Sequence, residues 1–100
     1  MKNKFLILDN DNILGVLELD IKQPIIKQLK KIFTYEYVLN KLGEDTVYDL
    51  ELWEGYSISF IKLLDSIQGE SCNIYEISIY GDNGVKILEI ININNFKKFN

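Results

Sequence analysis

Carboxylates are the side chains of this sequence best suited to chemistry, and two of them stand together near its start. Asp9-Asn10-Asp11-Asn12 begins like a calcium-binding loop, in which oxygen ligands alternate along the chain. The pattern then fails, because Ile13 occupies the next ligand position and Leu14 the position that requires glycine. Asn and Asp are also typical residues of tight turns. We therefore interpret the segment as a polar hairpin turn, and we expect neither a metal site nor a cofactor.

The sequence lacks the residues on which the common enzyme mechanisms depend. The sequence has no His, which removes the usual general base and the usual metal ligand. Cys72 is the only cysteine, so no disulfide and no cysteine-rich zinc site can form within the chain. Glu76 and Glu89 could meet across a hairpin as an acid–base pair, but a solvated strand face is the simpler interpretation. We expect that the protein is not an enzyme.

Acidic residues are concentrated in one segment, which is the candidate binding site. From Gly43 to Phe60 the chain has five carboxylates, no Lys, and its only Trp. A large aromatic side chain ringed by charge has the composition of an interface hot spot with a polar rim. The alternative is that the Trp folds into the core and the acids solvate an edge. The candidate partner-binding residues are Glu44, Asp45, Asp49, Glu51, Trp53 and Glu54.

A second charged surface competes with this one. Five Lys fall on the outer face of a predicted helix, and such a face could meet nucleic acid. No aromatic residue interleaves with them, and Lys on an exposed helix is ordinary surface. The net charge of −4 also argues against nucleic acid, because phosphate binding depends on Lys and Arg. We interpret these as solvated residues: Lys22, Lys27, Lys30, Lys31 and Lys41.

The first half of the chain predicts a hairpin followed by a helix. Apolar runs at 4–8 and 13–19 flank the Asp/Asn turn, which is typical of a β-hairpin. Apolar residues then recur with helical spacing from Ile25 to Leu42, after Pro24 and before Gly43. This pattern predicts one long helix over about residues 23–42.

The segment from 46 to 62 allows two interpretations. With Trp53-Glu54-Gly55 as a three-residue loop, Tyr48, Leu50 and Leu52 would face Phe60, Ile58 and Tyr56, and the polar residues would share the other face. That register favours a hairpin. The alternative is a helix over 57–68, begun by Ser57 and ended by Gly69.

The clearest hairpin joins residues 73–80 to 85–91 through Gly81-Asp82-Asn83-Gly84. The expected fold is therefore α+β in the order ββαββββ, a mainly antiparallel sheet with one helix packed on a face. A helix over 57–68 would change that order to ββαβαββ. We expect residues 1–100 to form a single compact domain.

Composition and charge then suggest a role. Abundant Lys, Asn and Ile without Ala is typical of a low-GC genome such as that of a bacterium, phage or mobile element. The first apolar run is too short for a signal peptide, so we expect a cytoplasmic protein. The hypothesis is a monomeric or dimeric acidic protein that binds and inhibits a basic, nucleic-acid-processing protein, as an immunity protein or an anti-CRISPR-type phage inhibitor would. The alternative is a non-catalytic assembly module that pairs through a sheet edge.

Overall fold

The computed structural model describes residues 2–53, 56–63 and 74–93. These residues form five strands and three helices in the order ββαααβββ. The α+β class and the antiparallel sheet are as predicted. The order of the elements and the single long helix are not, and both differences lie between residues 25 and 50.

The first hairpin agrees with the sequence. β1 (Lys2–Asp9) pairs antiparallel with β2 (Asn12–Asp20), and Asn10 in the turn adopts φ 55°. Asn tolerates this left-handed conformation because its short polar side chain can bond locally. The carboxylate of Asp9 forms an ion pair with Lys86 at 2.8 Å, so it serves to hold the first hairpin to the last one.

The predicted long helix is two helices, α1 (Ile25–Ile32) and α2 (Tyr35–Leu42). Thr34 is extended and caps α2, because its hydroxyl accepts a hydrogen bond from the Tyr37 N–H at 3.2 Å. The break also turns Phe33 inward, where its ring lies 5.0 Å from the Tyr37 ring and 6.2 Å from the Phe60 ring. A helical stripe of apolar residues continues across the break, and the stripe alone therefore predicted one helix.

The predicted hairpin over 46–62 is wrong, because its first half is the helix α3 (Glu44–Leu50). Gly43, at φ 87°, lets α2 end and α3 begin within one residue. Val47 is buried and Leu50 is half-buried, a helical spacing that the alternating pattern of Tyr48, Leu50 and Leu52 concealed.

The last three strands are β3 (Ser57–Leu63), β4 (Ile74–Gly81) and β5 (Gly84–Asn92). β3 pairs with β4, so the alternative of a helix from residue 57 is wrong as far as Leu63; residues 64–68 lie outside the described chain. The β4–β5 hairpin has the predicted register, with Ile77 opposite Leu88 and Glu76 opposite Glu89.

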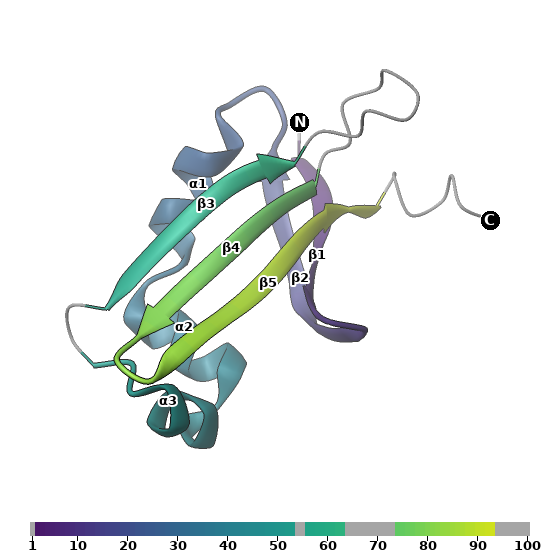
Figure 1. Cartoon of the computed structure of the whole chain (residues 1–100). Coiled ribbons are helices and arrows are strands. Elements are labelled where there is room, and N and C mark those ends of the chain that lie inside the picture. Colours follow the sequence, from purple (N-terminus) through teal and green to yellow (C-terminus); the bar gives the residue numbers. More distant parts are fainter. Residues whose placement is uncertain (1, 54–55, 64–73, 94–100) are drawn as a thin grey trace.

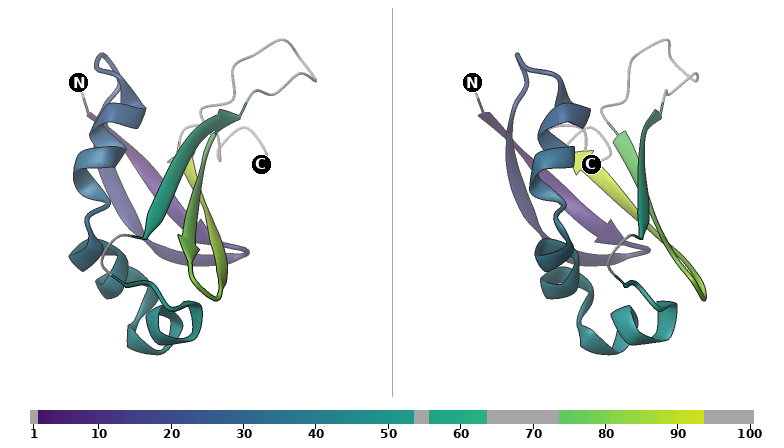
Figure 2. Two further views of the ribbon diagram at one scale, coloured as in Figure 1. Left: turned by 60° about the vertical axis from the view of Figure 1, so that its left-hand side comes forward. Right: turned by 90° about the vertical axis from the view of Figure 1, so that its left-hand side faces the viewer.

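The sheet has the order β2-β1-β5-β4-β3 and the helices lie on one side of it (Figure 1). Helix α1 contacts both edge strands, β2 and β3, so the sheet curves around the helices (Figure 2). The core fills this concave face. None of the described helices is long and apolar enough to cross a membrane. The core side chains are Phe5, Ile7, Leu17, Leu19, Leu29, Phe33, Val38, Val47, Leu52, Tyr75, Ile77, Ile79, Leu88 and Ile90.

Candidate protein-binding site

Helix α3 and the three residues after it carry the candidate acidic residues. Glu44 and Asp45 occupy the first turn of α3, where negative charge is favoured by the helix dipole. Asp49 lies in its last turn, and Glu51 follows with φ 53° and ψ 54°, the left-handed conformation that ends the helix. We call these four carboxylates, together with Tyr48 and Trp53, the acidic corner.

The carboxylates of the acidic corner face solvent. Glu44, Asp45, Asp49 and Glu51 are all exposed. None of the four has an ion-pair partner among the described residues, in contrast to Asp9, which is held by Lys86. Within the described chain, the negative charge of the corner is therefore not neutralised by an ion pair, and such charge attracts a cationic surface.

The acidic corner also carries two exposed aromatic side chains. Tyr48 is 69% exposed and Trp53 is 45% exposed. Their rings meet edge to face, with 5.7 Å between centroids and 88° between planes. This contact fixes both rings at the surface, since edge-to-face packing is a favoured aromatic geometry. The interpretation in which Trp53 folds into the core is wrong. The expected position of Tyr48 opposite Phe60 is also wrong, because Tyr48 lies in α3 and Phe60 pairs with Ile77.

A shallow pocket of about 320 Å³ opens beside these rings. Its chemistry is mixed, because aromatic and aliphatic walls meet a single carboxylate, that of Glu44. Such a site can take the aliphatic stem of a Lys or Arg, with the cationic head near the carboxylate and over an aromatic face. The pocket is lined by Tyr35, Leu39, Glu44, Val47, Tyr48 and Trp53.

The β4–β5 turn holds the acidic corner in place. The N–H groups of Asp82 and Asn83 donate to the carbonyls of Glu51 and Leu50, at 3.3 and 3.1 Å. The side-chain amide of Asn83 donates to the carbonyl of Asp49 at 2.9 Å. These bonds satisfy carbonyls that the end of a helix leaves without intrahelical partners. The corner is thus attached to the sheet and has a fixed shape.

Leu52 anchors the same segment from inside. It is fully buried, and its N–H donates to the carbonyl of Val47 at 3.0 Å. The neighbouring residue, Trp53, is left at the surface. Leu52 points into the core and the next residue, Trp53, points to the surface, and together they set the direction of the chain at the corner.

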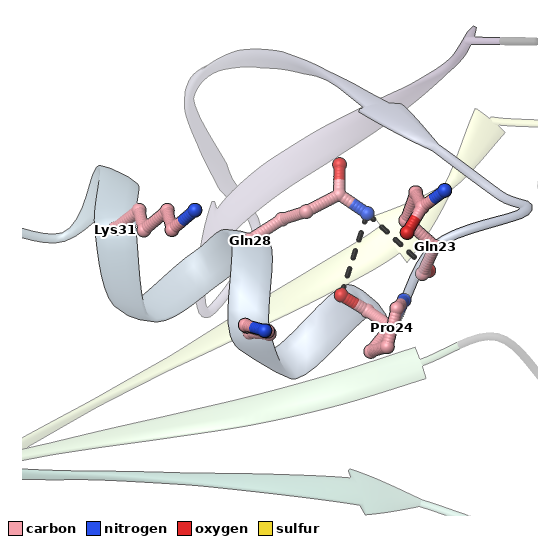
Figure 3. A pocket seen from close by; sticks show the side chains of 5 residues that line it. Gln23, Pro24, Gln28 and Lys31 are labelled. Carbon is pink, nitrogen blue, oxygen red and sulfur yellow. Dashed lines mark hydrogen bonds between the residues drawn. The ribbon is translucent and has the colours of Figure 1, made fainter.

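The Lys-bearing surface on α1 is a weaker candidate. A pocket of about 200 Å³ lies there, lined by Gln23, Pro24, Lys27, Gln28 and Lys31 (Figure 3). Its central amide is already occupied, because Gln28 Nε2 donates to the carbonyl of Asp20 at 2.8 Å and Gln28 Oε1 accepts from the Asp20 N–H at 2.9 Å. Gln28 therefore ties the end of β2 to α1, and its amide serves the fold.

The structure brings five of the six predicted residues to one corner, and Glu54 lies outside the described residues. Sequence reasoning missed Tyr35 and Leu39 of α2, which complete the pocket. Their i, i+4 spacing marked them as core residues, and only the packing of α3 beside α2 shows that they also line a surface hollow.

Within the described ranges, no three Asp, Glu, Cys or His side chains are grouped closely enough to hold a metal ion. Comparisons with protein-family models, with curated proteins and with solved structures found no match. A function must therefore be inferred from the geometry and charge of the site.

Proposed function

We propose that this protein binds a basic partner protein through the acidic corner and inhibits it. One observation carries the proposal: an exposed pair of packed aromatic rings, Tyr48 and Trp53, lies among four carboxylates without ion-pair partners in the described chain. Aromatic anchors within a polar rim are the usual composition of an energetic hot spot.

The negative charge of the acidic corner indicates what kind of surface the partner has. This charge attracts a Lys- or Arg-rich surface and accelerates association with it. Proteins that process nucleic acids carry such surfaces, because they neutralise phosphates with Lys and Arg. An acidic protein seated there occupies the place of the nucleic acid and blocks it. The corresponding biological roles are an immunity protein for a nuclease toxin and an anti-CRISPR-type phage inhibitor, each acting in the cytoplasm without catalysis.

A capture experiment with matched variants tests the proposal. The immobilised protein is exposed to an extract of the source cell, and retained proteins are identified by mass spectrometry. The test variant combines Asp49→Lys, Glu51→Lys and Trp53→Ala. The control combines Asp11→Lys, Glu18→Lys and Ile21→Ala, which makes the same charge change and truncates a side chain with the same 45% exposure as Trp53.

We expect the wild type and the control to retain the same basic protein and to inhibit its action on nucleic acid in proportion to their amount. The test variant should neither retain nor inhibit it, because charge and anchor are both lost. Retention should also weaken as salt rises, since exposed charges are screened. Equal binding by the test variant would contradict the assignment of the surface.

The alternative function is assembly through a sheet edge. It is favoured by β2 and β3, each of which pairs on only one side within the described sheet. An unpaired edge is a template for a strand of another chain. Sedimentation of the purified protein separates the two functions, because a stable homo-oligomer supports assembly and a monomer supports inhibition.

A further inference from the structure

The convex face of the sheet, opposite the helices, carries a second group of exposed apolar side chains. Six large apolar residues there are between 45% and 61% exposed. They come from β2, β3, β4 and β5, that is, from four of the five strands. Exposed apolar side chains that gather on one face mark an interaction site more often than the same side chains scattered singly. The six are Ile13, Val16, Ile61, Tyr80, Val85 and Ile87.

Two carboxylates lie in the middle of this face. Glu76 of β4 is directly opposite Glu89 of β5, and both are only half-exposed. The strand registers continue this row to Ile61 on one side and to Leu8 on the other. Like charges directly opposite on neighbouring strands repel one another. Within the described chain neither carboxylate has an ion pair or a hydrogen bond.

The same sheet shows how the chain balances charge elsewhere. On the convex face, Lys4 of β1 is directly opposite Glu18 of β2, an arrangement of opposite charges that stabilises a strand pair. Lys86 of β5 lies on the concave side and is held by Asp9 at 2.8 Å. The Glu76–Glu89 pair therefore differs from its surroundings, because the described residues supply no cation to it.

We propose that the convex face is a second protein-docking surface, whose partner presents one Lys or Arg surrounded by apolar side chains. The cation would lie between Glu76 and Glu89, whose β-carbons are about 5 Å apart in such a pair, and would turn repulsion into a bridge. Ile61, Ile87 and Leu8 would contact the apolar ring around it. Exclusion of water by that ring strengthens the ionic contact.

A second copy of the chain fits this face poorly. Packing two convex faces about a two-fold axis through their centres would bring four carboxylates together without a cation. The Glu pair thus opposes self-association through this face, as inward-pointing charge does on other exposed sheets. The proposal is independent of the acidic corner, which lies on α3 and not on the sheet.

Selection from a random phage-displayed peptide library tests the partner's chemistry. The library is panned against the wild-type protein, and clones that also bind the Glu76→Gln/Glu89→Gln variant are discarded. The expected winners are apolar peptides with one Lys or Arg. Replacing that residue by norleucine should weaken binding about tenfold or more, which is the typical effect of losing a partly buried ionic hydrogen bond.

Three variants test whether the peptides bind at the convex face and through this carboxylate pair. Glu89→Lys should abolish binding and raise the melting temperature, because it gives Glu76 a cross-strand cation like the Lys4–Glu18 pair. Glu18→Gln is the control on the same face and should bind as the wild type does. The acidic-corner variant Asp49→Lys/Glu51→Lys/Trp53→Ala should also bind normally.

Several results would overturn the proposal. These are failure to enrich any peptide, winners without a cation, or winners that depend on the acidic corner. A lower melting temperature for Glu89→Lys would mean that the two carboxylates do not repel. A concentration-dependent dimer in sedimentation, dissociated by Ile87→Ser, would assign the face to self-association instead.

Discussion

Replacing Gly81 by Ala should detach the acidic corner from the sheet. A β-carbon at this position would lie 2.0 Å from the Leu50 carbonyl oxygen and 2.8 Å from Leu52 Cδ2, so the β4–β5 turn and α3 must separate. The turn makes three hydrogen bonds to the carbonyls of residues 49–51. At about 1 kcal/mol each, their loss should lower the free energy of unfolding by about 3 kcal/mol.

The sign of this effect is diagnostic. Where an Ala fits, replacing Gly stabilises a protein by about 0.4–1 kcal/mol, because the unfolded chain loses freedom. Gly15→Ala is the matched control, since its β-carbon would lie 3.0 Å from Lys41 Nζ, the movable end of a long side chain. We expect Gly15→Ala to be neutral or slightly stabilising.

Urea unfolding followed by Trp53 fluorescence measures both variants, and it reports on the corner directly because Trp53 is the only Trp. Gly81→Ala should lower the unfolding midpoint and alter the fluorescence of the folded state. If Gly81→Ala is as stable as Gly15→Ala, the turn does not hold α3 as described. Gly81→Ala should also weaken partner binding at urea concentrations where the variant is still folded.

Three further predictions concern the stability of the fold. Leu52→Ala removes a fully buried side chain and should cost about 2–5 kcal/mol in calorimetric unfolding; a loss below about 1 kcal/mol would contradict its anchoring role. Thr34→Ala removes the α2 cap and should cost about 0.5–2 kcal/mol in urea unfolding, whereas Thr34→Ser should behave as the wild type does. Burial raises the pKa of Tyr37, Tyr56 and Tyr75, so their contribution to stability should be constant below about pH 10 and be lost as pH rises beyond it; melting temperatures that increase there would contradict this.

The two terminal hairpins could be predicted because their signals are local. The Asp9–Asn12 turn lies between apolar runs, and the turn at 81–84 sets a register that places Glu76 opposite Glu89. Each hairpin also pairs its own strands, so no distant element was needed to choose the register.

The middle of the chain could not be predicted in the same way. Thr34 is a good helix cap, but the apolar stripe around it continues with helical spacing, and only the burial of Phe33 favours the break. Apolar Tyr48, Leu50 and Leu52 alternate with polar residues, as in a strand that could pair with β3. In the structure β3 pairs with β4. In both segments, tertiary contacts determine the secondary structure and override the local sequence pattern.

The acidic character of the candidate site does not depend on whether its residues form a hairpin or a helix. Charge is set by composition, and a segment with five carboxylates and no Lys is acidic in any conformation. The packing of Tyr48 on Trp53 and the pocket walls from Tyr35 and Leu39 do depend on α3, and the sequence did not reveal them.

Hydrogen exchange of the protein, free and bound to the captured basic partner, tests the central claim most directly. The amides of Glu44–Leu50 and of residues 51–53 should exchange more slowly in the complex, while those of the edge strand β2 should not change. Protection along β2 or β3 with no change at the acidic corner would contradict the claim and support pairing through a sheet edge.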